Sequence, residues 1–166
     1  MNPQVLERIR AVKRASQVLR AGAWRAADAV DRVALDADER YRRRIVLAAE
    51  RGGKFLLDLP ATTALRDGDG LVLDDGTIVA VAARPEPLVE IAAGEDSAAL
   101  TRLAWHLGNR HTELQIVGDR LRMRRDRVLE EMLAGLGAHL TPIEAPFEPE
   151  RGAYENGHGD GRGGRG

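Results

Sequence analysis

The chain has 166 residues, of which 43% are hydrophobic and 31% are charged, and its formal net charge is −1. This length and hydrophobic share suffice for one domain or two small ones, while the near-neutral charge provides no global attraction to nucleic acid or a membrane surface. The sequence has no cysteine, which excludes disulfides and thiolate metal sites, so a transition metal would need histidine nitrogens with carboxylate or backbone oxygens.

The N-terminal residues 1–13 are basic and weakly amphipathic. They contain no continuous apolar core of the kind found in a signal peptide, and no apolar run in the chain is long enough to span a bilayer. We therefore expect a frayed N-terminal extension on a cytoplasmic protein that does not associate with membranes.

Short strands with turn residues between them follow in residues 14–82. Two hairpins are predicted, one around 50–53 and one around 74–76, and together these features indicate a small all-β domain. The segment 67–70 has two aspartates but lacks the remaining ligands of a calcium loop, so it is interpreted as a turn. The arginines at 42–44 open a strand, where a solvated or ion-paired edge is expected.

Two prolines in the segment 82–87 favour an extended linker and a domain boundary. The elements expected over 85–145 come in the order β-α-β-β-α-β. The first helix follows a capping aspartate, Asp96, and the second follows Asp126. This order predicts a ferredoxin-like domain, so the fold class is α+β: a small all-β N-terminal domain followed by a ferredoxin-like C-terminal domain.

Alternation in the central hairpin of this domain assigns its side chains to two faces of the sheet. Four residues are expected to face the core, namely Leu114, Ile116, Leu121 and Met123. Five face outward: Glu113, Gln115, Arg120, Arg122 and Arg124. An RNA-recognition domain has the same element order but stacks bases on aromatic residues of the open face, and this face has none. No catalytic triad or phosphate-binding loop is visible, so no enzyme is expected.

The two predicted helices of this domain determine where its histidines are expected to lie. The apolar face of the second helix is expected to hold Val128, Leu129, Met132, Leu133 and Leu136. The first helix is expected to end at Gly108 in a left-handed conformation, which leaves His111 just beyond the helix end. Spacing alone favours a hydrogen-bonded loop histidine over a metal ligand there. On a helix, a spacing of five residues points the side chains of His106 and His111 in different directions. His106 is therefore expected to be a packed or carbonyl-bonded residue rather than a second ligand, and His139 is interpreted as structural.

Three runs occur in the order found in a known family: HLGNRH at 106–111, DRVLEEMLAGLG at 126–137 and PFEPERGAY at 146–154. Together they resemble the urease accessory nickel metallochaperone family, UreE, and the similarity extends from about Ala15 to Tyr154. The resemblance implies a two-domain homodimer that delivers Ni(II) for assembly of the urease active site. It also implies an N-terminal domain similar to peptide-binding chaperone modules, with the urease maturation GTPase UreG and the urease apoprotein complex as partners.

The resemblance further implies that His111 is the shared nickel ligand near the dimer axis. One imidazole cannot complete a nickel coordination sphere, but a two-fold axis supplies a second copy, and Zn(II) or Cu(II) would compete for such a site. The chain departs from the family at Arg125 and Arg127, where some members have histidines. The glycine-rich tail 146–166 is expected to be flexible and has one histidine, His158, as an auxiliary ligand. The alternative is a ferredoxin-like RNA- or protein-binding module without a metal function.

Overall fold

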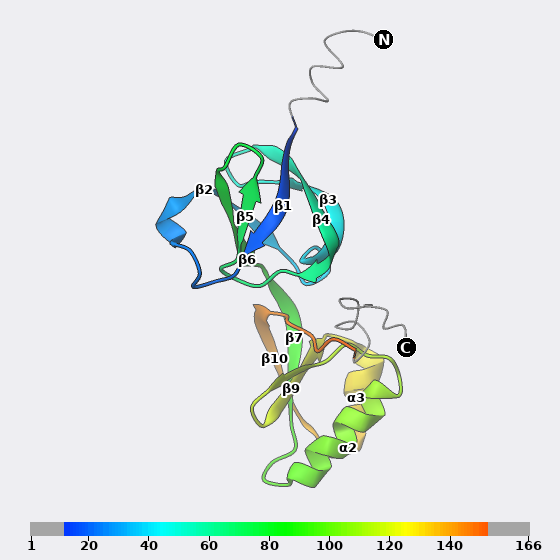
Figure 1. Ribbon diagram of the computed structural model, residues 1–166. Helices are drawn as coiled ribbons and strands as arrows, with labels where there is room; N and C mark the ends of the chain where they lie inside the picture. Colours follow the sequence, from blue (N-terminus) through cyan, green and yellow to red (C-terminus); the bar gives the residue numbers. More distant parts are fainter. Residues whose placement is uncertain (1–11, 153–166) are drawn as a thin grey trace, which may run out of the picture. The chain divides into compact units, whose positions relative to one another are not determined.

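The computed structural model describes residues 12–152, and the chain divides into two compact units between Glu86 and Pro87 (Figure 1). The first unit consists of strands, and the second combines strands with two helices. The predicted α+β class is therefore confirmed. The two units are described separately below.

The N-terminal unit is one six-stranded sheet in the order β2-β6-β5-β1-β4-β3, with a single 3-10 turn, η1 (Ala26–Asp28), before β2. Its strands are β1 (Lys13–Leu19), β2 (Ala29–Leu35), β3 (Tyr41–Ala48), β4 (Lys54–Ala64), β5 (Gly70–Leu73) and β6 (Ile78–Ala83). The two predicted hairpins are confirmed, since β3 pairs with β4 and β5 with β6 in antiparallel register.

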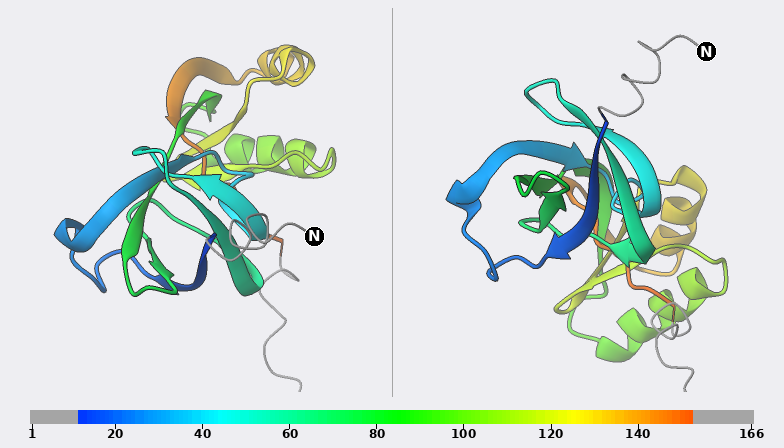
Figure 2. Two further views of the ribbon diagram at one scale, coloured as in Figure 1. Left: turned by 90° about the horizontal axis from the view of Figure 1, so that it is seen from above. Right: turned by 45° about the horizontal axis from the view of Figure 1, so that its top comes forward.

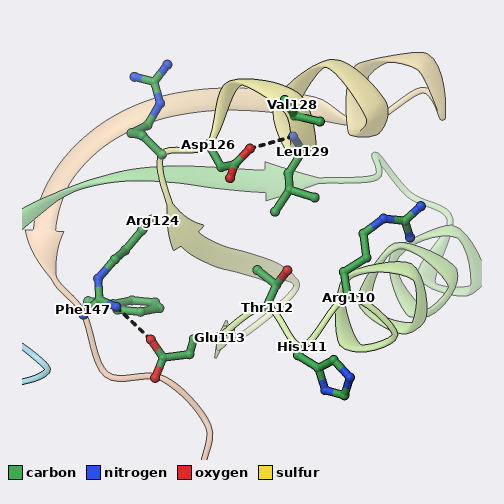
Figure 3. A pocket seen from close by; sticks show the side chains of 10 residues that line it. Arg110, His111, Thr112, Glu113, Arg124, Asp126, Val128, Leu129 and Phe147 are labelled. Atoms are coloured by element: carbon green, nitrogen blue, oxygen red, sulfur yellow. Dashed lines mark hydrogen bonds and ion pairs between the residues drawn. The ribbon is translucent and has the colours of Figure 1, made fainter.

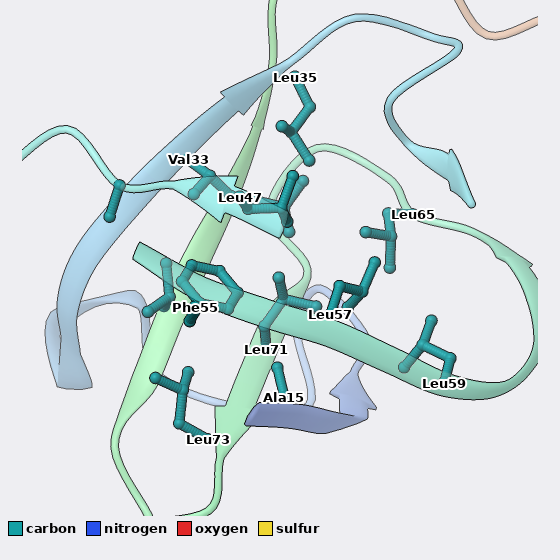
Figure 4. Close-up of a cluster of buried hydrophobic side chains, with 13 residues drawn as sticks. Ala15, Val33, Leu35, Leu47, Phe55, Leu57, Leu59, Leu65, Leu71 and Leu73 are labelled. Carbon is teal, nitrogen blue, oxygen red and sulfur yellow. The ribbon is translucent and has the colours of Figure 1, made fainter. Parts of the chain in front are cut away.

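Alternation along the strands builds the core of this unit. In β4, Phe55, Leu57 and Leu59 are buried, whereas Leu56 and Asp58 between them are only half-buried. Figure 4 shows the buried side chains converging with those of neighbouring strands, such as Leu47 and Leu71. Removing this apolar surface from water is the main stabilising contribution, at about 25 cal/mol per Å².

The predicted turn at 67–70 is confirmed, and its aspartates are structural. The buried carboxylate of Asp69 accepts hydrogen bonds from Arg20 Nη1 at 2.7 Å, from the Ala21 amide at 3.0 Å and from the Arg66 amide at 2.9 Å. These charge-assisted bonds hold the loop after β1 against the turn before β5. In the same loop, Trp24 Nε1 donates to the Gly68 carbonyl at 3.2 Å, and the indole lies against Gly70.

The C-terminal unit has the predicted order β-α-β-β-α-β, with a four-stranded sheet in the order β10-β7-β9-β8. Its elements are β7 (Pro85–Ala92), α2 (Ser97–Gly108), β8 (Gln115–Val117), β9 (Arg120–Arg124), α3 (Arg127–Gly135) and β10 (His139–Pro146). Both predicted capping aspartates are confirmed, because Asp96 accepts from the Ala98 amide and Asp126 from the Leu129 amide, each at 2.9 Å.

Both helices of this unit cover the same face of the sheet (Figure 2). The buried cluster joins residues of α2 and α3, such as Leu107 and Leu133, to Ile91, Leu121 and Met123 of the sheet. The core assignment of Ile116 is wrong, because its side chain is 58% exposed although it pairs with buried Leu121. β8 is the edge strand of the sheet, so alternation gives Ile116 the correct face but a position where little packs over it.

The chain continues past β10 along an ordered path within the range predicted as tail. Phe147 is fully buried, and the Arg124 guanidinium lies 5.1 Å from its ring centroid. Beyond it, the Glu148 amide donates to Gln115 Oε1 at 3.1 Å and the Glu150 amide donates to the Leu114 carbonyl at 2.6 Å. Residues 147–150 are thereby fixed beside β8.

The end of α2 differs from the prediction that Gly108 adopts the left-handed conformation. The helix runs through Gly108, Asn109 is right-handed at φ −64°, and the left-handed residue is His111, at φ 55°. The His111 amide donates to the Gly108 carbonyl at 3.0 Å and the Thr112 amide to the Leu107 carbonyl at 3.2 Å. These two bonds form a Schellman motif with His111 at C′, a position usually held by glycine.

Among residues 12–152, His111 is the one non-glycine residue with a positive φ. A left-handed conformation costs an L-residue with a Cβ about 1–2 kcal/mol. Histidine tolerates it better than most side chains, but still less well than glycine. The fold therefore places its candidate ligand at a conformationally unfavourable position.

The contact between Trp24 and Gly70 gives a first prediction. A Cβ at Gly70 would lie 2.8 Å from the Trp24 indole, so Gly70→Ala is expected to lower the free energy of unfolding by about 1–3 kcal/mol through overpacking. Gly53→Ala is the matched control, because nothing lies within 4 Å of its added Cβ. Denaturant titration should show the control to be as stable as the native chain or slightly more stable, because alanine lowers the entropy of the unfolded chain. Equal loss in both variants would contradict the packing argument.

The left-handed turn gives a second prediction. The His111→Gly variant should be more stable than the His111→Ala variant, with a free energy of unfolding higher by about 0.5–1 kcal/mol. Glycine relieves the left-handed strain, and this gain outweighs the extra entropy that glycine gives the unfolded chain. At His106, inside α2, the order should reverse, since alanine is the better helix former. Thermal denaturation of the four variants tests both signs, and an alanine preference at position 111 would refute the strain.

Candidate metal centre

His111 lies at the rim of an open hollow of about 500 Å³ in the C-terminal unit (Figure 3). The hollow is formed by the loop after α2, the end of β9, the beginning of α3 and the chain beyond β10. Its lining residues are Arg110, His111, Thr112, Glu113, Arg124, Arg125, Asp126, Val128, Leu129 and Phe147.

The His111 imidazole is exposed, and it makes no side-chain hydrogen bond or ion pair with the part of the chain that the structure describes. Figure 3 shows its ring pointing away from the other side chains drawn around the hollow. Both ring nitrogens are therefore available to a ligand from outside this protomer. A neutral imidazole nitrogen is a good ligand for nickel, copper and zinc.

The one carboxylate close to His111 in sequence, Glu113, is paired with arginine. Arg124 Nη1 lies 2.7 Å from Glu113 Oε2, and Arg151 Nη1 lies 3.9 Å from the other oxygen. The arginine in the closer pair also lies over the ring of Phe147. This cluster balances the charge of Glu113, so metal coordination by that carboxylate would compete with its ion pairs.

Ion pairs also occupy Arg125 and Arg127, the two positions where the resemblance described above leads us to expect histidines in some relatives. Arg125 makes a bidentate contact with Glu130, at 2.7 and 2.9 Å, which lowers the pKa of that carboxyl below its ordinary value. Arg127 Nε lies 2.9 Å from Glu131 Oε1, one helical turn further along α3. The Asp126 carboxylate caps α3 by accepting a hydrogen bond from the Leu129 amide. The carboxylates on this side of the hollow are therefore already bound to groups of the protein itself.

The two other described histidines, His106 and His139, do not line the hollow. His106 is half-buried in the last turn of α2, where its ring meets the Trp105 ring edge-on at 5.1 Å, and its carbonyl accepts a hydrogen bond from Arg110. His139 is the exposed first residue of β10. His158 lies outside the described residues. Within residues 12–152, no group of three or more histidine, aspartate or glutamate side chains is arranged to hold a metal ion.

Sequence reasoning missed the apolar side of the hollow. Val128 was assigned to the buried face of α3, but it is 74% exposed and lines the hollow beside half-buried Leu129. Leu136, from the same predicted face, is 49% exposed. Phe147 had no assigned role, although an aromatic residue between prolines directly after the last strand was a signal that the chain packs there.

The outer face of the sheet bears on the RNA-binding alternative. Arg120 and Arg122 both bind Glu90, and their hydrogen bonds, led by that of Arg120, lower the pKa of Glu90. Two of the cations on this face are therefore compensated within the protein, which leaves less positive charge to bind the phosphates of RNA.

No helix in the described part of the chain is both long and apolar enough to cross a lipid bilayer.

Comparison with known proteins identifies the family. Residues 5–84 match the model of the UreE urease accessory protein N-terminal domain, and residues 86–165 match that of its C-terminal domain. A urease accessory protein UreE of Bradyrhizobium sp. (strain ORS 278) is 56% identical over 141 residues, which cover 85% of this chain and 66% of that protein. One from Rhodobacter capsulatus is 49% identical over 144 residues, or 87% of this chain and 88% of that protein.

Some relatives are considerably longer than this chain. A UreE protein of Rhodopseudomonas palustris (strain HaA2) is 56% identical over 130 residues, but these make up only 60% of its length. The two domain models nonetheless match in succession along nearly the whole sequence, with their junction at the boundary between the two compact units. The chain therefore belongs to the UreE family of urease accessory proteins.

Proposed function

We propose that this chain is a metallochaperone that binds Ni(II) at His111 and delivers it for assembly of the urease active site. The observation that carries the proposal is the unpartnered imidazole of His111, presented by a strained left-handed turn at the rim of the hollow. Nickel is the cargo here rather than a resident cofactor. The family membership supports urease as the destination.

The site is completed by a second copy of the chain. One protomer offers one imidazole at the hollow and no cluster of three ligands among its described residues. A homodimer built through the C-terminal unit would bring two His111 side chains to one axis. The exposed Val128 beside the hollow supports this arrangement, because burying an apolar side chain in a dimer interface removes it from water and stabilises the dimer.

The ligand set suits transfer rather than permanent storage. Imidazoles without thiolates leave coordination positions open to water or to an acceptor's ligands. His158, in the glycine-rich sequence after Gly152, is an auxiliary ligand in this proposal. Zn(II) and Cu(II) would compete, because imidazole binds them as well. The proposed recipients are the GTPase UreG and the urease apoprotein complex, in the cytoplasm.

Stoichiometry tests the shared site. We expect one tightly bound Ni(II) per dimer, because Arg125 and Arg127 are paired with glutamates and provide no separate site. His111→Ala should abolish tight binding, while His139→Ala, which changes another exposed histidine of the same unit, should leave it unchanged. Calorimetry combined with light scattering measures the ion count and the mass of the binding species.

Two outcomes would refute this assignment. Tight nickel binding that survives in His111→Ala would place the metal elsewhere. A monomer at micromolar concentration, with and without nickel, would remove the second imidazole. Truncation after Tyr154 separates the role of His158, since it should weaken the affinity but leave the ion count at one per dimer.

The affinity should also depend on pH. Protons and nickel compete for the same imidazole nitrogen, so the nickel affinity is expected to fall as the pH is lowered from about 8 to 5. Equilibrium dialysis across this range measures the trend, with His139→Ala expected to follow the native curve. An affinity that stays constant over the range would show that carboxylates rather than histidines hold the ion.

A further inference from the structure

The outer surface of strands β3 and β4 in the N-terminal unit carries an unusual set of side chains. Leu47 and Phe55 point into the core from these strands (Figure 4). Because side chains alternate across a strand, the residues next to them point outward. Val46 is paired with Leu56, and Ala48 is paired with Lys54, in the antiparallel register.

Cations surround this surface without partners. Several other cations of this unit bind a carboxylate, in the pairs Lys13–Asp75, Arg14–Asp58, Arg20–Asp69, Arg25–Asp28, Arg32–Glu50 and Arg84–Asp36. Arg42, Arg43, Arg44 and Lys54 are exposed, and their side chains make no ion pair or hydrogen bond with residues 12–152. The acid paired across from Arg44, Asp58, is engaged by Arg14 at 3.1 Å.

Apolar side chains lie among these cations. Val46 is 60% exposed, and its cross-strand partner Leu56 is half-buried. We call Arg42, Arg43, Arg44, Val46, Lys54 and Leu56 the basic face. Arg42 and Arg43 belong to it by their exposure, because a register shift between Arg42 and Arg44 interrupts the alternation there. It lies at the edge of the sheet, because β3 pairs with β4 on one side and ends the strand order on the other.

We propose that the basic face is a docking surface for an acidic segment of a partner protein, in which carboxylates alternate with small apolar residues. The clustered cations would attract such a segment and fix its orientation. The apolar pair Val46 and Leu56 would bury its uncharged side chains. This surface belongs to the N-terminal unit, and none of its residues is a proposed nickel ligand.

A protein segment fits this face better than a nucleic acid does. Non-specific binding of single strands relies on aromatic side chains that stack on bases. The exposed residues of β3 are arginine, valine and alanine, with no aromatic residue among them. An apolar centre ringed by cations is instead typical of a protein interface with a charged rim.

The test measures binding of a fluorescein-labelled synthetic peptide of alternating glutamate and valine to the full chain by fluorescence anisotropy. The double variant Arg42→Glu with Arg44→Glu should weaken binding by about tenfold or more, since two attractions become repulsions. Val46→Ser should weaken it by about threefold through lost apolar burial. Raising the salt concentration should weaken the native complex.

The matched control is Arg25→Glu with Arg102→Glu, which changes the net charge equally at exposed positions outside strands β3 and β4. Its affinity should stay within about twofold of the native value, since distant exposed charges are screened. Arg42→Lys with Arg44→Lys should retain binding, which separates charge from folding. Equal loss in the control would overturn the proposal, as would equal binding of a lysine–valine peptide or tighter binding of an oligothymidylate strand.

Discussion

The left-handed backbone at His111 is the constraint on which the candidate metal centre depends. Two hydrogen bonds, from the His111 and Thr112 amides to carbonyls of the last turn of α2, stop the helix and direct the chain toward β8. A right-handed residue at this position would extend the helix and carry the imidazole with it. Strained conformations of this kind persist where the surrounding structure holds them, and they concentrate at functional sites. Here α2, packed through Leu103 and Leu107, is the rigid support.

Around that turn, charge compensation limits what a single protomer can do. Glu113 is bound by Arg124, Glu130 by Arg125, and the Asp126 carboxylate caps α3. Each pairing satisfies a carboxylate that would otherwise be a metal ligand, so the imidazole is left as the available donor among the lining residues described. The arrangement favours ligands supplied from outside the protomer, by a second copy or by an acceptor. A loosely held ion is easier to pass on than one enclosed by a complete protein shell.

Most of the fold could be predicted from the sequence, because periodicity and caps are local signals. Asp96 and Asp126 marked the starts of both helices of the C-terminal unit, and alternation placed Leu121 and Met123 in its core. Several of the predictions that were wrong concern residues whose burial depends on what packs over them in the folded protein. Ile116 and Val128 follow the expected patterns but lie where little covers them. Gly108 was a plausible helix end by residue type, yet the hydrogen bonding displaced the left-handed residue to His111. His158 lies outside the described residues and stays a prediction.

The return of the chain from Phe147 to Glu150 determines where any C-terminal extension is attached. Because the Glu150 amide is bonded to the Leu114 carbonyl, the backbone is anchored next to Glu113 at the hollow instead of at the end of β10. His158 comes eight positions after Glu150 in the sequence, and a fully extended chain of that length spans at most about 28 Å. The residues after Glu150 therefore start from a fixed position near the loop that holds His111. A tail of any length or ligand content attached there would start from the same place.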